Sequence, residues 1–127
     1  MPDLAVVTFA DAAAFDAWLA ANHGCHEGIW IKMAKKGTGV PSITSDEAVD
    51  VGLCWGWISS HRKAQDDTYF RQKYTPRRPR SRWSKVNVDK VAVLAAAGRM
   101  RPPGQAEVDA AQADGRWAAV AGATPTQ

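Results

Sequence analysis

Carboxylates are absent from one thirteen-residue stretch of this chain, Thr75–Asn87, which nevertheless holds five cations, two prolines and a tryptophan. The wider window 71–90 carries eight of the sixteen Lys and Arg residues and one acid, a net charge of +7, whereas the other 107 residues carry −4. The overall charge of +3 therefore combines a basic patch with a mildly acidic body. Such asymmetry indicates an anionic partner.

Long apolar runs and export signals are also lacking. No run approaches the roughly 18 residues that a membrane span requires, and the first residues contain no basic cluster. Cysteine is scarce, and Cys25 and Cys54 are expected to stay reduced thiols. These absences predict a cytoplasmic protein without a membrane span, and 127 residues suffice for one domain with its own core.

Motifs of catalysis and metal binding are missing as well. The chain shows no nucleophile elbow, phosphate-binding glycine loop or paired carboxylates, and 23–26 (His-Gly-Cys-His) is too cramped for a zinc site. We therefore predict no metal and no cofactor. Cys54 near His61 is better explained as an apolar helix residue than as a nucleophile. Catalysis stays undecided, with His61, Asp67 and Tyr69 as the candidate acid–base groups near the basic stretch.

Capping signals and helical spacing predict four helices. Thr8 with Asp11 and Thr44 with Glu47 fit the capping box, and Asn87 fits the N-cap of a third helix. The expected helices run from Thr8 to about Asn22, from Thr44 to Trp55, from Asn87 to Gly98, and from Pro102 to about Gly115.

Short β-branched and aromatic runs predict about three strands, at 27–33, 57–63 and 68–74, the last two forming a hairpin that turns at Asp66-Asp67. The fold class is therefore α+β, a single small domain with helices at both ends. The domain is expected to span 1–121, with 122–127 as a flexible tail.

The basic stretch is the predicted binding site. Pro76 and Pro79 forbid a helix and hold it extended, and arginine clamps phosphate or carboxylate with paired hydrogen bonds. The candidate ligand-binding residues are Lys35, Lys36, Trp57, Arg77, Arg78, Ser81, Trp83, Ser84, Lys85 and Asn87.

Three alternatives stay open at this point. The arginines can instead pair with acids of the body while a tryptophan packs beneath them. Trp55, Trp57 and Trp83 fit either a stacking surface or the core, with the core favoured. The pair 35–36 is either a solvated loop or a second edge of the anion site.

Several motifs together resemble the bacterial YdeI or OmpD-associated family, also called bacteriocin-protection proteins. In order along about 110 residues, the motifs are Trp18-Leu19 with Asn22-His23, Ile29-Trp30, Lys35-Lys36, Cys54-Trp55-Gly56-Trp57-Ile58, Tyr74-Thr75-Pro76-Arg77-Arg78, Ser81-Arg82-Trp83-Ser84-Lys85-Val86-Asn87, Gly98-Arg99-Met100 and Asp114-Gly115-Arg116-Trp117. The resemblance implies a link to tolerance of cationic antimicrobial peptides and to an outer-membrane porin, without an agreed activity. One departure is Ser59, where that family usually has an acid after Gly-Trp-Ile.

Together these observations predict a protein that binds an anionic small molecule or phosphate-bearing ligand through the basic stretch. The first alternative is a nucleic-acid-binding module, because cations interleaved with aromatic residues follow a phosphate backbone and stack bases. The second is a protein-interaction domain that acts in envelope stress, and an enzyme is the least supported reading.

Overall fold

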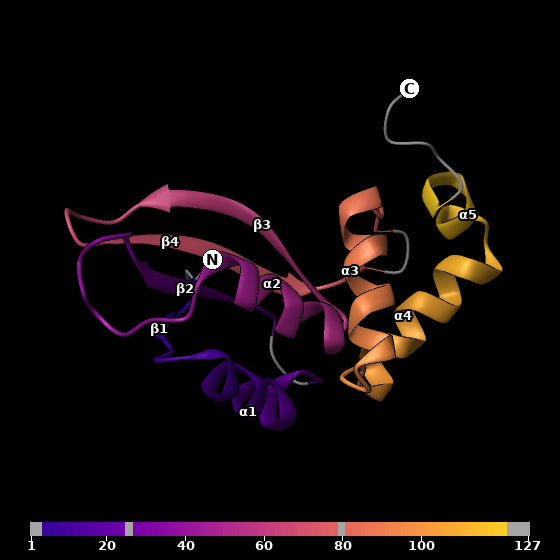
Figure 1. The fold of residues 1–127 in the computed structure, drawn as a ribbon, viewed down its shortest axis with the longest axis horizontal. Helices are drawn as coiled ribbons and strands as arrows, with labels where there is room; N and C mark the ends of the chain where they lie inside the picture. The colour runs from indigo at the N-terminus through magenta and orange to yellow at the C-terminus, as the bar shows by residue number, and fades with distance from the viewer. Residues whose placement is uncertain (1–3, 25–26, 79–80, 122–127) are drawn as a thin grey trace.

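The computed structural model describes residues 4–24, 27–78 and 81–121, which form a four-stranded sheet and five helices (Figure 1). The elements in chain order are β1 (Val6–Thr8), α1 (Ala12–Asn22), β2 (Ile29–Ala34), α2 (Ser45–Cys54), β3 (Trp57–Ala64), β4 (Tyr69–Pro76), α3 (Lys85–Ala96), α4 (Pro102–Ala113) and α5 (Arg116–Ala121). The predicted α+β class is confirmed. The strand count is four rather than about three, because β1 has only three residues, too few to show an alternating pattern.

The sheet has the order β1-β2-β4-β3, with β1 parallel to β2 and the other neighbours antiparallel. Strand β2 alternates strictly, so that Ile29, Ile31 and Met33 are buried on one face. Phe15 and Leu19 of α1 and Ala48 and Val51 of α2 pack on that face and belong to the first core cluster. The opposite face of the sheet contributes no residue to either core cluster among the described residues.

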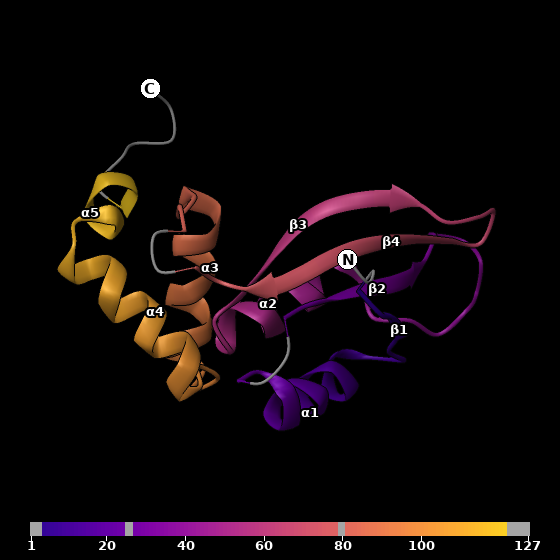
Figure 2. The same ribbon diagram turned by 180° about the vertical axis from the view of Figure 1, so that it is seen from behind.

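A second core cluster lies beyond one end of the sheet, where α3, α4 and α5 pack together (Figures 1 and 2). Leu53 and Cys54 at the end of α2 join it to the first cluster. Helix α4 approaches α2 so closely that a Cβ on Gly104 would overlap the carbonyl of Cys54. Only glycine permits that approach, which fixes the helical layer against the sheet layer.

Helix starts agree with the sequence in two cases and differ in two. Helix α4 begins at Pro102, as predicted. The capping box of α2 is confirmed, since Thr44 Oγ1 accepts the Glu47 N–H at 3.1 Å and Glu47 Oε1 accepts the Thr44 N–H at 3.0 Å. The first helix is capped by Asp11 rather than by Thr8, which belongs to β1. The prediction that Asn87 caps the third helix is wrong, because Ser84 does so.

The predicted hairpin is confirmed as β3 and β4. Asp66 Oδ1 closes its turn by accepting the N–H groups of Thr68 and Tyr69 at 2.9 and 2.8 Å. Between Ser59 and Arg62 the strand β3 contains one residue more than β4 does opposite it, a β-bulge.

Three further findings concern the remaining predictions. Helix α5 follows α4 after a two-residue turn and was not predicted. The expected tail 122–127 lies outside the described residues. Within the described part of the chain, no helix has the length and apolar character needed to cross a membrane.

Candidate functional site

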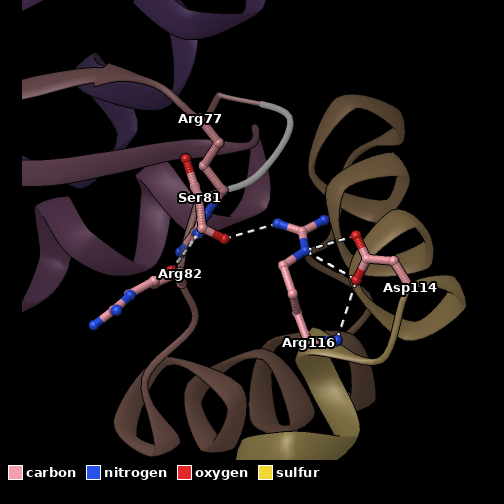
Figure 3. Close-up of polar contacts among 5 residues, drawn as sticks. All are labelled: Arg77, Ser81, Arg82, Asp114 and Arg116. Carbon is pink, nitrogen blue, oxygen red and sulfur yellow. Dashed lines mark hydrogen bonds and ion pairs between the residues drawn. The ribbon is translucent and has the colours of Figure 1, made fainter.

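The basic stretch that dominates the sequence is built into the fold at its first arginine. Arg77 is only 8% exposed, and its guanidinium carbon lies 3.7 Å from the ring centroid of Trp83. Its Nη1 donates to the carbonyl of Arg82 at 3.1 Å (Figure 3). Its backbone N–H donates to the carbonyl of Gly56 at 2.9 Å. Burial lowers the pKa of Arg77 to about 10, an effect that Glu107 opposes and Arg116 reinforces. Arg77 therefore holds the stretch against the helices.

A second arginine locks the same stretch from α5. Arg116 Nη1 donates to the carbonyl of Ser81 at 2.7 Å, and its Nε lies 2.8 Å from Asp114 Oδ2 (Figure 3). Trp83 is 7% exposed and meets Trp117 edge to face, with ring centroids 5.0 Å apart. Trp83, predicted as a ligand residue, is thus a core residue that contacts Arg77 and a second indole.

The remaining predicted residues of the stretch make local contacts. Ser81 Oγ accepts the backbone N–H of Arg78 at 2.8 Å, and Ser84 Oγ accepts the N–H of Asn87 at 3.1 Å. Lys85 forms an i,i+4 ion pair with Asp89 at 2.7 Å. Both hydroxyls thus satisfy backbone donors, and Arg78 is the exposed cation among these residues.

The other predicted ligand residues lie elsewhere. Trp57 is 1% exposed, packs edge to face on Trp18 and belongs to the first core cluster, so its ring offers no stacking surface. Lys35 and Lys36 follow β2 at the end of the sheet opposite Arg77, because β2 and β4 are antiparallel and Ala34 pairs with Tyr69 at the start of β4. The structure therefore does not gather the ten predicted residues into one site.

Acid–base and metal chemistry find little support in the described residues. Cys54 is a buried free thiol whose pKa is raised chiefly by burial, which disfavours the nucleophilic thiolate. His61 lies in the β3 bulge and Asp67 in the hairpin turn, both away from Arg77 along the sheet. No group of three His, Cys, Asp or Glu side chains in the described part of the chain is placed to hold a metal ion. Of the cramped 23–26 motif, Cys25 and His26 lie outside the described residues.

The outward face of the sheet presents a different group of basic residues. The strand register places four cations there, Lys32 from β2, Arg71 and Lys73 from β4, and Lys63 from β3. Trp30 and Tyr69 lie on the same face, and no strand residue that points outward is an acid. We call these six residues the sheet-face cluster.

Cations and rings touch within the sheet-face cluster. Lys32 Nζ lies 4.4 Å from the ring centroid of Tyr69, and the guanidinium carbon of Arg71 lies 4.8 Å from that of Trp30. Lys63 Nζ lies 5.8 Å from the Trp30 ring although β4 separates the two strands, so the indole extends across β4. The rings are half-buried under these contacts rather than enclosed in a core.

None of the four cations of this cluster has a carboxylate within 4.0 Å among the described residues. A face with four unpaired cations attracts polyanions, and two half-buried rings can stack on flat groups. The sequence signal for it was alternation: Trp30 and Lys32 alternate with buried residues in β2, as Arg71 and Lys73 do in β4. The alternation predicts the strands, whereas the residues that share the exposed face follow from the strand register.

Comparison with known proteins gives a family and no activity. No curated protein and no solved structure shows a significant match to this chain. A family model described as Domain of unknown function (DUF8412) matches residues 7–107, which span β1 to the middle of α4 and include the whole sheet-face cluster. The chain therefore belongs to the DUF8412 family.

Proposed function

We propose that this protein binds single-stranded nucleic acid on the outward face of its sheet. The observation that carries the proposal is the sheet-face cluster, with four cations, two aromatic rings and no outward-pointing strand acid. Cations that follow a phosphate backbone supply affinity, and rings that stack on bases add about 1–3 kcal/mol per base. The sequence alone favours the basic stretch for this activity, as an alternative to small-anion binding.

The form of the surface favours single strands over duplexes. Stacking on Trp30 or Tyr69 requires the face of a base, which is hidden in a duplex and available in a single strand. A sheet holds its side chains on rigid elements, so the cluster is ordered before binding. Lys32 contacts the Tyr69 ring and Arg71 contacts the Trp30 ring, so cations and rings lie side by side on this face.

The basic stretch supports the proposal less well. Its first arginine, Arg77, is buried against Trp83, and its lysine, Lys85, is paired with Asp89. A small-anion site there stays a prediction that depends on exposed Arg78 and Arg82. Membership of the YdeI or OmpD-associated family also stays a proposal, and a face with four cations would repel a cationic antimicrobial peptide rather than bind it.

Fluorescence anisotropy with labelled single-stranded RNA, single-stranded DNA and duplex DNA tests the proposal. The test variant carries Lys63→Ala, Arg71→Ala and Lys73→Ala. The control carries Arg78→Ala, Arg82→Ala and Arg99→Ala, which removes the same charge from exposed positions off the sheet face. We expect single strands to bind wild type and control, and the test variant to bind them at least tenfold more weakly.

The salt dependence of the affinity separates direct contacts with phosphates from general attraction by the net charge of the protein. Each lost phosphate contact lowers the slope of log affinity against log salt by about 0.7 for single strands, so the test variant should lose about 2. Equal loss of affinity in both variants would reduce the effect to net charge. Loss of affinity in the control variant alone would indicate that the binding site is the basic stretch. Absence of binding by wild type would reject the proposal.

A further inference from the structure

A cavity of about 340 Å³ lies on the helix side of the sheet, at the end farthest from α3 to α5. Its lining is Met33, Ala34, Lys35, Lys36, Thr44, Ser45, Arg62 and Phe70. Met33, the last inward-facing residue of β2, pairs here with Phe70, the first inward-facing residue of β4, and α2 begins nearby at Ser45. The loop 35–44 joins β2 to α2 around this region (Figure 1).

The loop is held in place by its own hydrogen bonds. Ser42 Oγ accepts the N–H of Ala34 at 3.0 Å and donates to the carbonyl of Ile43 at 3.0 Å. Thr38 Oγ1 donates to the carbonyl of Lys35 at 3.0 Å. The lysines of the loop are therefore carried on an anchored turn at the edge of the cavity.

Arg62 forms the opposite wall. Its guanidinium carbon lies 4.5 Å from the ring centroid of Phe70, and its Nη2 donates to Ser45 Oγ at 3.3 Å and to Gln72 Oε1 at 3.4 Å. Ser45 Oγ in turn donates to Gln72 Oε1 at 3.0 Å. This network fixes the arginine over an aromatic ring while its partners are neutral.

The charges around the cavity are unbalanced. Three lining residues are cations and none is an acid, and no carboxylate of the described residues lies within 4.0 Å of any of the three. Of the acids close to these residues in sequence, Glu47 caps α2 and Asp66 closes the hairpin turn. Asp46 is exposed on the first turn of α2 and does not line the cavity.

We propose that this cavity binds a small amphiphilic anion, with a carboxylate or phosphate head on Lys35, Lys36 and Arg62 and an apolar body against Met33 and Phe70. Ligand sites of this size are commonly apolar with a few convergent polar groups, and lysine and arginine are the usual partners of such heads. The site is separate from the nucleic-acid surface, because Arg62 and Lys63 point to opposite faces of the sheet.

The test uses phenyl phosphate as the probe, with inorganic phosphate and phenol as its separated halves. Binding is measured by isothermal calorimetry and by the thermal midpoint of the whole protein at constant ionic strength. We expect saturable binding of phenyl phosphate with a raised midpoint, weaker binding of phosphate, and none of phenol. Benzoate in place of phenyl phosphate shows whether a carboxylate head suffices.

Two variants locate the site. Arg62→Ala and the double variant Lys35→Ala, Lys36→Ala should each weaken phenyl phosphate binding about tenfold or more. Because Lys35 and Lys36 are exposed, the double variant Lys35→Ala, Lys36→Ala keeps the test valid if Arg62→Ala disturbs the hairpin. Lys63→Ala is the matched control, one residue away on the other face, and should bind the probe like wild type.

The results separate this proposal from the preceding one. Loss of probe binding in the cavity variants with unchanged oligonucleotide binding supports two sites. Probe binding that survives both cavity variants, or that is lost equally in Lys63→Ala, overturns the cavity proposal. So does the absence of saturable binding of phenyl phosphate and benzoate to wild type.

Discussion

Two arginine–tryptophan pairs in this protein share one chemistry and differ in burial. Arg77 lies 3.7 Å from the Trp83 ring, which is 7% exposed within the second core cluster. Arg71 lies 4.8 Å from the Trp30 ring, which is half-buried on the outward face of the sheet. The first pair fastens a loop to the helices, whereas the second leaves cations and a ring on a surface.

The comparison shows that charge density along the sequence does not by itself mark a binding surface. The stretch 77–87 concentrates its cations within a few residues, but the fold buries or pairs part of them. The sheet-face cluster draws its cations from three strands and brings them side by side. Four predictions test this contrast, from the largest expected effect to the smallest.

Replacing the buried ring should cost the most. Trp83→Ala removes a core residue that contacts Arg77 and Trp117, and we expect a loss of about 3–5 kcal/mol in the free energy of unfolding. Trp30→Ala, on the exposed face, should cost about 1 kcal/mol or less. Urea denaturation followed by circular dichroism measures both, and equal losses would contradict the contrast.

The half-buried ring of Trp30 should matter for nucleic-acid binding instead. Trp30→Ala should weaken single-strand affinity by about 1–3 kcal/mol, because it removes a stacking surface. Tyr69→Leu, which keeps bulk and removes the aromatic face, is the companion variant. Anisotropy titrations give both values, and unchanged affinity in the two variants would mean that the rings serve only the packing of the sheet.

Ser84 should act through the helix alone. Ser84→Ala removes the N-cap of α3 and should cost about 1 kcal/mol of stability, without changing oligonucleotide or phosphate binding. Asn87→Ala, at the position that the sequence favoured as the cap, should cost less. The reverse order of stabilities in thermal denaturation would contradict the capping assignment.

The buried charge of Arg77 should have the smallest net effect. Arg77→Met keeps an apolar chain over Trp83 and removes a cation whose burial is costly, so stability near neutral pH should change by about 1 kcal/mol or less in either direction.

The pH dependence of that effect has a definite sign. The pKa of folded Arg77 is lowered to about 10, so above this pH the folded chain loses a proton that the unfolded chain still holds. The cost of burying the cation is therefore full below pH 10 and is relieved as pH rises through the folded pKa. Wild type should gain stability relative to Arg77→Met above about pH 10, and a constant difference would contradict the lowered pKa.

Much of the fold was predictable because its signals are local. The capping box at Thr44, the hairpin turn at Asp66 and the spacing of buried residues in the helices each depend on residues within one or two turns. The cap at Ser84 was missed because Ser84 and Asn87 are both good caps, and only the start of the helix decides between them. Strand β1 was missed because its pairing with β2 is non-local.

The candidate site was less predictable because it depends on register. Trp30 and Lys63 belong to strands that are not neighbours, and their approach follows from the order β2-β4-β3. Likewise, nothing within residues 75–87 shows that Trp117 will pack on Trp83. Nor does that segment show that Arg116 will donate to the carbonyl of Ser81. Alternation of cations with buried residues in the strands was the available signal, and it becomes specific only when the neighbouring strands are known.

The most direct test of the account is a titration of the isotopically labelled protein with a single-stranded oligonucleotide, followed by amide and indole N–H signals in NMR. The chain has six tryptophans, and single Trp→Phe variants assign their indole signals. We predict that the Trp30 indole and the amides around Lys32, Lys63, Arg71 and Lys73 shift in a saturable way, while the Trp83 indole and the first turn of α3 stay in place. Shifts confined to Trp83 and residues 77–87, with the sheet face unchanged, would contradict the account.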